Sequence, residues 1–267
     1  MGRTKRNLQW YTLFNRRKFW LCNGDRFNNR WRLDYKRSLM GKLLAIIPAR
    51  GGSKGIPNKN IKTFNGKPLI YWTIKTALES KTIDKVVVSS DSNKILKLSK
   101  QFGAEIILRP KKISGDKATT ESAIKHCIKY YKNSYKNIAL LAPTNPLRMT
   151  SDIDNAYKFF KLNNLDSCFS GASITDFLIW NLDKKSKKYS SINYDYKNRG
   201  RRQNRKLGYV ENGCIYIFKP WLIMKKNNRI GGKFDIFKMK FWQSFEIDEK
   251  EDWKLLETMH KVYILNK

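Results

Sequence analysis

Short apolar runs alternate with helical patterns along the chain from Lys42 onward. A continuous apolar run predicts a strand buried on both faces of a sheet, whereas apolar residues three or four positions apart predict an amphipathic helix. The predicted strands are 43–47, 86–88, 106–108, 138–141, 167–170, 214–218 and 243–247, and the predicted helices lie near 68–78, 95–102, 124–131, 151–161 and 253–259. This alternation predicts right-handed β-α-β crossovers, and therefore an α/β fold with a mostly parallel sheet in a three-layer arrangement.

The segment 176–206 interrupts this alternation because it is polar and basic. We interpret it as an excursion or a small subdomain, and as a candidate for contact with a partner chain. No internal repeat is detected, so residues 40–267 are interpreted as one domain that contains this excursion.

The first 39 residues differ from the rest in their basic residues, with 8 Arg and 3 Lys against 8 Arg and 36 Lys from Met40 onward. One explanation is a basic, aromatic arm that contacts phosphates and stacks on bases. The other is that Met40 is the true start and that residues 1–39 are upstream sequence. We prefer the second explanation, because neither a helical nor a strand period organises the aromatic residues of this extension.

The charge of the whole chain points to an anionic partner. Its 55 Lys and Arg against 22 Asp and Glu give a formal charge of +33, of which residues 1–39 carry nine. A nucleic acid, a membrane surface or a small phosphorylated substrate would each suit this charge. Lysines spread along the whole sequence indicate a compositional bias and argue against a specific nucleic-acid site.

Composition excludes several other classes of protein. Apolar residues make up 41% of the chain, which is too many for a mainly disordered protein. No apolar run approaches the roughly 20 residues of a membrane-spanning helix. The four cysteines form no C-x-x-C pair and only two histidines occur, which argues against a zinc site or a disulfide framework. We therefore expect a cytoplasmic protein.

A glycine-rich turn at residues 48–60 directly follows the first predicted strand. Ligands bind at this edge of open α/β sheets. Glycines let a backbone approach a polyphosphate closely, and the turn also carries Arg50, Lys54 and Lys59. Neither the Walker pattern nor Gly-x-Gly-x-x-Gly is matched. We interpret residues 48–60 as a phosphate-binding turn, and the alternative is an ordinary surface turn in a lysine-rich protein.

This turn, Ile47-Pro48-Ala49-Arg50-Gly51-Gly52-Ser53-Lys54-Gly55-Ile56-Pro57, resembles the opening signature of the acylneuraminate cytidylyltransferases, the CMP-sialic acid synthetases. Further segments resemble this family in the same order along the chain. They are 59–61, 66–70, 88–91, 108–110 with Asp116 and 119–120, 140–148, 201–203, 211–216, and 245–248 with 251–253. The resemblance runs from about Lys42 to Leu256, and several motifs in one order are more specific than any single motif.

The resemblance implies a Rossmann-like nucleotidyltransferase fold and a defined reaction. In this family the anomeric hydroxyl of a nine-carbon 2-keto sugar acid attacks the α-phosphorus of CTP, and pyrophosphate leaves. Positioning and charge neutralisation supply most of such catalysis. The implied partners are CTP and a nonulosonic acid, with N-acetylneuraminate first and legionaminate or pseudaminate as alternatives. The resemblance to this family also implies that the protein forms a homodimer.

The resemblance also implies roles for individual residues. Catalytic roles fall on Arg50, Lys59 and Asp248, and nucleotide binding on Arg50, Gly51, Ser53, Lys54, Lys59, Asn60, Arg109 and Thr120. Sugar binding falls on Arg202, Gln203 and Tyr216, where a guanidinium can bind a carboxylate with two hydrogen bonds. Mg²⁺ is expected on Asp248 and Glu246, because it prefers carboxylate oxygens shared with substrate phosphates. Residues two apart on a strand share a face, so both carboxylates can reach one ion.

Two positions depart from the family pattern. Glu246 stands where the family usually has an aspartate, and Ala142 where many relatives have a glutamine beside the sugar. The accepted sugar acid stays open because alanine cannot hydrogen-bond to a hydroxyl or N-acyl group. The general base is unassigned because neither histidine falls on a family motif. His126 and His260 are expected to be structural, and Asp91 either holds the nucleotide loop or helps to bind metal. Two alternatives to an active cytidylyltransferase are an inactivated nucleotidyltransferase-like protein and a basic nucleic-acid-binding protein.

Overall fold

The computed structural model describes residues 42–53, 55–174, 177–201, 203 and 208–266. The predicted N-terminal extension 1–39, Lys54 and Arg202 therefore lie outside the described residues. Residues 42–267 group into one compact unit by their internal contacts. None of the helices described is long and apolar enough to cross a membrane.

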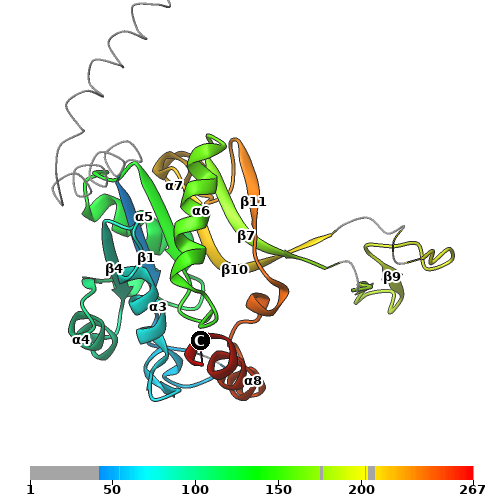
Figure 1. Cartoon of the computed structure of the whole chain (residues 1–267), viewed down its shortest axis with the longest axis horizontal. Helices are drawn as coiled ribbons and strands as arrows, with labels where there is room; N and C mark the ends of the chain where they lie inside the picture. Colours follow the sequence, from blue (N-terminus) through cyan, green and yellow to red (C-terminus); the bar gives the residue numbers. More distant parts are fainter. Residues whose placement is uncertain (1–41, 54, 175–176, 202, 204–207, 267) are drawn as a thin grey trace, which may run out of the picture. The chain divides into compact units, whose positions relative to one another are not determined.

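A seven-stranded sheet forms the centre of this unit, in the order β11-β7-β10-β6-β1-β4-β5 (Figure 1). The strands are β1 (Leu43–Pro48), β4 (Lys85–Ser90), β5 (Glu105–Leu108), β6 (Asn137–Leu141), β7 (Ser167–Ser173), β10 (Tyr209–Phe218) and β11 (Phe234–Lys238). Only β10 runs antiparallel to its neighbours, β6 and β7, while the other four pairings are parallel. The predicted α/β class with a mostly parallel sheet is therefore confirmed.

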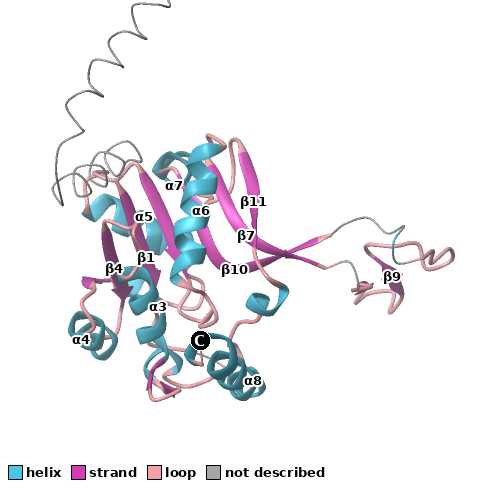
Figure 2. Cartoon of the chain, viewed as in Figure 1, coloured by secondary structure: helices cyan, strands magenta, loops and turns pink. Residues whose placement is uncertain are grey.

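Helices cover both faces of this sheet (Figure 2). They are α3 (Leu69–Leu78), α4 (Asn93–Gln101), α5 (Thr120–Tyr130), α6 (Thr150–Leu162), α7 (Pro220–Lys226) and α8 (Lys250–His260). Helices α5 and α7 contact each other on one face, and α3 contacts α4 and α6 on the other. All of β1 except its last residue is buried, as its uninterrupted apolar run predicts.

Local sequence signals explain where several helices begin and end. Pro68 precedes α3 and Pro220 opens α7, because proline has the backbone angle of a helix start and needs no N–H partner there. The Thr119 hydroxyl caps α5 by accepting a hydrogen bond from the Ser122 N–H at 3.2 Å. Just beyond α4, Gly103 adopts φ +92°, a conformation that favours glycine.

The prediction of a strand at residues 243–247 is wrong. The segment instead contains a 3₁₀ turn, η5 (Phe241–Ser244), followed by extended chain outside the sheet. Ile247 is fully buried against α3 and α8, and its N–H bonds to the Thr144 carbonyl at 2.9 Å. The edge strand next to β7 is β11, whose polar and basic flanks gave no clear strand signal. An apolar pattern alone does not say which surface an extended segment packs against.

The excursion at 176–206 contains a separate two-stranded sheet, β8 (Trp180–Leu182) paired with β9 (Tyr189–Ser191). Its strands are largely exposed, and Trp180 contacts the rings of Tyr194 and Tyr196 at 5.8 and 5.3 Å. Two further short strands, β2 (Thr63–Phe64) and β3 (Lys67–Pro68), form a small hairpin before α3.

An irregularity in β10 shapes the region described next. Glu211 pairs with Gly171, and Tyr216 pairs with Phe169. The two residues of β10 are five positions apart, whereas their partners on β7 are two positions apart. Within this bulge Gly213 adopts φ +65°. The Asn212 amide oxygen accepts hydrogen bonds from Ser170 Oγ at 2.6 Å and from the Cys214 N–H at 3.2 Å, which fixes the bulge in place.

Candidate active site

A cavity of about 670 Å³ opens beside the carboxyl ends of β1 and β6, next to the bulge of β10. The sequence motifs that converge on it are the glycine-rich turn, the start of α5, the 142–144 segment and the 246–249 segment. Nine of the predicted site residues line it, namely Arg50, Ser53, Lys59, Asn60, Arg109, Thr120, Tyr216, Glu246 and Asp248. Parallel strands commonly place ligands at this edge of a sheet.

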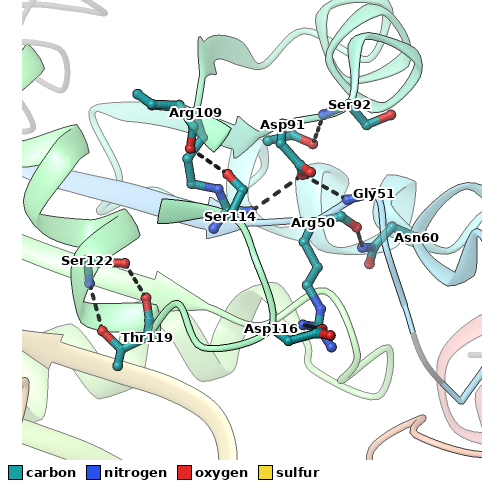
Figure 3. A network of polar contacts seen from close by, with 12 residues as sticks. Arg50, Gly51, Asn60, Asp91, Ser92, Arg109, Ser114, Asp116, Thr119 and Ser122 are labelled. Atoms are coloured by element: carbon teal, nitrogen blue, oxygen red, sulfur yellow. Dashed lines mark hydrogen bonds and ion pairs between the residues drawn. The ribbon is translucent and has the colours of Figure 1, made fainter. Parts of the chain in front are cut away.

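Polar contacts hold the glycine-rich turn in place (Figure 3). The Gly51 N–H donates to Asp91 Oδ1 at 2.9 Å, and Asn60 Nδ2 donates to the Arg50 carbonyl at 3.1 Å. A Cβ atom on Gly51 would lie 3.0 Å from Ser92 Cβ, so this position has little room for a side chain. Of the two roles open for Asp91, the structure supports the first, because this carboxylate anchors the turn.

Arg109 brings a buried positive charge to the cavity wall. Arg109 is 7% exposed, and neither its Nε nor its Nη2 has a hydrogen-bond partner among the described residues. The nearest carboxylate oxygen, Asp91 Oδ1, lies 3.9 Å from Nη2 (Figure 3). Burial lowers the pKa of Arg109, and Asp91 opposes this shift. A buried guanidinium with unused donors is well suited to bind an anionic ligand.

Arg50 adds a second guanidinium at the mouth of the cavity. Its Nη1 lies 3.3 Å from Asp116 Oδ1, in a contact that joins the glycine-rich turn to the loop before α5 (Figure 3). Both side chains are largely exposed, so this ion pair is weak and leaves Arg50 able to exchange Asp116 for a phosphate.

The 246–249 segment supplies the carboxylates of the cavity. Lys59 Nζ donates to the Ile247 carbonyl at 2.6 Å and to Asp248 Oδ1 at 2.9 Å. Glu246 Oε2 accepts a hydrogen bond from Thr144 Oγ1 at 3.3 Å. Burial raises the pKa of Glu246, and the nearby charge of Asp248 raises it further.

These two carboxylates fit a divalent cation. Although the segment is not a strand, Glu246 and Asp248 both line the cavity while Ile247 between them is buried in the core. A cation between the two would relieve the repulsion that raises the pKa of Glu246. In the part of the chain that the structure describes, no three His, Cys, Asp or Glu side chains are grouped so that they could hold a metal ion.

The inner wall of the cavity is built from strand β10 and the loop after α7. The Arg229 guanidinium lies over the Tyr216 ring, 4.4 Å from its centroid. Arg229 Nη1 forms an ion pair with Glu121, and the Tyr216 hydroxyl donates to Glu211. Sequence reasoning missed Arg229, Glu121 and Glu211 as a group, because Arg229 and Glu121 are 108 positions apart and belong to no common motif.

Comparison with known proteins identifies the family. The profile of the family described as cytidylyltransferase matches residues 44–263, which is most of the chain. The chain belongs to the cytidylyltransferase family. An N-acylneuraminate cytidylyltransferase of Escherichia coli is 33% identical over 226 residues, covering 82% of this chain and 52% of that protein. The chain spans about half the length of several such relatives, including one from Streptococcus agalactiae at 29% identity.

Other matches extend over whole proteins. The post-translational flagellin modification protein B of Campylobacter coli is 29% identical over 83% of this cytidylyltransferase and 96% of its own length. The structure of a CMP:2-keto-3-deoxy-manno-octonic acid synthetase complexed with CTP superimposes with a TM-score of 0.64 at 15% identity. That match covers 84% of this chain and all of the other, and it confirms the nucleotidyltransferase fold.

Two motif residues of this cytidylyltransferase differ in what they contribute. Ala142 lines the cavity with only a methyl group. Arg148, from the same segment, is 1% exposed and instead ties the site together from behind. Its guanidinium donates to the carbonyls of Cys214 at 2.7 Å and Ala142 at 3.2 Å, and to Thr73 Oγ1 at 2.8 Å.

The remaining predicted residues lie away from the cavity lining. Gln203 is exposed and does not line the cavity, whereas Gly51 lies in the turn behind its lining residues. Neither histidine lines the cavity. His260 is fully buried between Phe64 and Trp72, and its Nδ1 lies 3.2 Å from Asn65 Nδ2, a structural role that agrees with the prediction.

Proposed function

We propose that this cytidylyltransferase transfers CMP from CTP to the anomeric hydroxyl of a nonulosonic acid and releases pyrophosphate. The observation that carries the proposal is Arg109, a buried guanidinium without hydrogen-bond partners at Nε and Nη2 among the described residues, beside an anchored glycine-rich turn. A triphosphate supplies the anionic oxygens that this arrangement lacks. Arg50, Gly51, Ser53, Lys54, Asn60 and Thr120 are the further nucleotide-binding residues of the proposal.

The proposed reaction is a direct displacement at the α-phosphorus. The anomeric oxygen forms a bond to this phosphorus, the bond to the β-phosphate oxygen breaks, and pyrophosphate leaves. Arg50 and Lys59 neutralise the charge that develops on the leaving group. The hydroxyl proton needs an acceptor, and carboxylates from 246–249 line the cavity whereas neither histidine does. A carboxylate is therefore the available class of general base.

Magnesium is the proposed cofactor, held by Asp248 and Glu246. A bound Mg²⁺ would polarise the phosphate oxygens and neutralise their charge. Lys59 already contacts Asp248 at 2.9 Å, so the carboxylate is oriented toward the cavity before any metal binds. The one-methylene difference of Glu246 from the usual aspartate is accommodated by its hydrogen bond with Thr144.

N-acetylneuraminate is the first candidate among the sugar acids. Support comes from the relatives that bear the name N-acylneuraminate cytidylyltransferase. Legionaminate and pseudaminate are the alternatives, and the match to a flagellin modification protein keeps them in consideration. Arg202, Gln203 and Tyr216 are the proposed sugar-binding residues, and the exposed β8–β9 segment is a candidate contact in a homodimer.

One assay tests this function. The purified chain is incubated with CTP, Mg²⁺ and each of the three sugar acids, and both pyrophosphate and the CMP-sugar are measured. We expect Mg²⁺-dependent turnover with at least one acid. Pyrophosphate release without a sugar acid would indicate CTP hydrolysis, and no release with any acid would refute the proposal.

A further inference from the structure

A cationic side chain outside the nucleotide-binding motifs lines the same cavity. Among the described residues, the cations of the cavity lining are Arg50, Lys59, Arg109 and Arg229. The first two belong to the glycine-rich turn, and Arg109 follows β5 directly and lies next to Asp91, which anchors that turn. Arg229 instead lies at the inner wall, over the Tyr216 ring.

The surroundings of Arg229 fix its position without using all of its donors. Nη1 pairs with Glu121, and the flat face of the guanidinium covers Tyr216. Nε has no hydrogen-bond partner among the described residues but is itself buried, so a ligand has to be bound through the Nη atoms. The side chain is 24% exposed and lines the cavity. Stacking and an ion pair orient an arginine for two-point binding of a carboxylate.

Two aliphatic residues of the cavity lining come from β6 and its carboxyl end. Leu140 pairs with Tyr216 across the sheet, and Ala142, two positions further, lies on the same face. Both have aliphatic side chains and line the cavity. A carboxylate placed near Tyr216 therefore finds a cation in Arg229.

We propose that Arg229 binds the carboxylate of the sugar acid and so distinguishes acidic sugars from neutral ones, an inference that rests on the proposed function. Glu121 is a positioning residue that holds the guanidinium. The assignment gives the sugar acid a cation separate from those that neutralise the triphosphate. Ala142, one of the two positions that depart from the family pattern, lines the same cavity.

The test compares a sugar acid with its C1 carboxamide, which keeps the shape but lacks the charge. The wild type is expected to prefer the acid. In Arg229→Ala, kcat/KM for the acid should fall at least about 30-fold, while KM for CTP changes less than about 2-fold. The preference for acid over amide should fall by a similar factor. An unchanged preference in Arg229→Ala would overturn the inference and leave carboxylate binding to another residue such as Arg202.

Further variants separate binding from folding. Arg229→Lys keeps a charge but loses the planar fork, so an intermediate loss is expected, and it serves as the test if Arg229→Ala does not fold. Lys226→Ala is the matched control, since Lys226 lies on α7 over Trp221, outside the cavity lining. Its preference for the acid should equal that of the wild type. A loss in Lys226→Ala equal to that in Arg229→Ala would show a general charge effect and overturn the inference.

The role of Glu121 has its own readout. Arg229→Ala leaves the Glu121 carboxylate unpaired beside the substrate charge. Adding Glu121→Gln to Arg229→Ala should therefore lower the KM for the acid below that of Arg229→Ala. Glu121→Gln alone should instead raise this KM above that of the wild type. Additive losses would contradict the positioning role. A wild type that turns over no sugar acid would refute the proposed function itself, which is a different outcome from all of these.

Discussion

Arg109 lines the cavity with a buried guanidinium whose Nε and Nη2 have no hydrogen-bond partners among the described residues. Its charge is buried, and the closest acid, Asp91, is 3.9 Å away and already accepts the Gly51 N–H. We expect Arg109→Ala to raise the Kd for CTP at least about 30-fold, which corresponds to about 2 kcal/mol of lost binding. Calorimetric titration with CTP measures this effect directly. Equal CTP affinity in the variant and the wild type would contradict the assignment.

Asp248 is the residue on which the proposed metal site depends most. Asp248→Ala should lower Mg²⁺-dependent kcat by about 100-fold or more, because an electrostatic stabiliser of the reaction is lost. The Asp248 side chain is 65% exposed and its ion pair with Lys59 is partly screened, so the fold should tolerate the change. Glu251→Ala, in the first turn of α8 outside the cavity lining, is the matched control. Near-normal turnover by Asp248→Ala would rule out this site.

The glycine-rich turn is the element whose shape is most restricted. A Cβ atom on Gly55 would lie 2.3 Å from the Asp248 carbonyl oxygen, whereas one on Gly52 would meet no atom within 4 Å. Gly55→Ala should therefore push the turn away from the 246–249 segment, cost about 1–3 kcal/mol in stability and lower kcat/KM by about 10-fold or more. Urea unfolding and steady-state kinetics measure both quantities.

Gly52→Ala in the same turn is the control for this change. It adds the same methyl group where no protein atom lies within 4 Å, so its stability should match that of the wild type. If both alanine variants behave alike, contact with the Asp248 backbone does not limit the turn.

At the scale of elements, the sequence predicted most of the sheet and its covering helices. Strands such as β1 and β6 are almost continuous apolar runs, which differ clearly from the three- or four-residue spacing of apolar residues in the helices. The segment 243–247 was misassigned because Ile247 is buried by α3 and α8 and not by a neighbouring strand. The motif residues of the cavity were predictable from their resemblance to a family. Arg229 and Glu121 were not, since their pairing arises only from the tertiary fold.

Stability of the whole unit should depend on pH through His260. Burial lowers the pKa of His260 to about 4, below the roughly 6.5 of an exposed histidine. The unfolded chain therefore binds a proton at a higher pH than the folded chain does. This contribution to the free energy of unfolding is fully present above about pH 6.5 and is lost as the pH falls toward 4.

Urea unfolding at several pH values tests this dependence. Between pH 7 and pH 4 the wild type should lose about 3 kcal/mol through this histidine alone. His260→Gln, which has no titrating ring, should show a correspondingly shallower pH dependence. Equal slopes for the two proteins would show that His260 does not control acid stability.

The bulge of β10 has a consequence for how insertions and deletions act on this molecule. On a regular strand, residues five positions apart point to opposite faces, yet Glu211 and Tyr216 are joined by a hydrogen bond. They meet because their partners on β7 are only two positions apart. Deletion of Gly213 would therefore turn the side chains of the β10 residues that precede it to the opposite face of the sheet. A single codon deletion here would turn Glu211 to the other face of the strand, away from the Tyr216 hydroxyl, while each remaining side chain kept its chemistry.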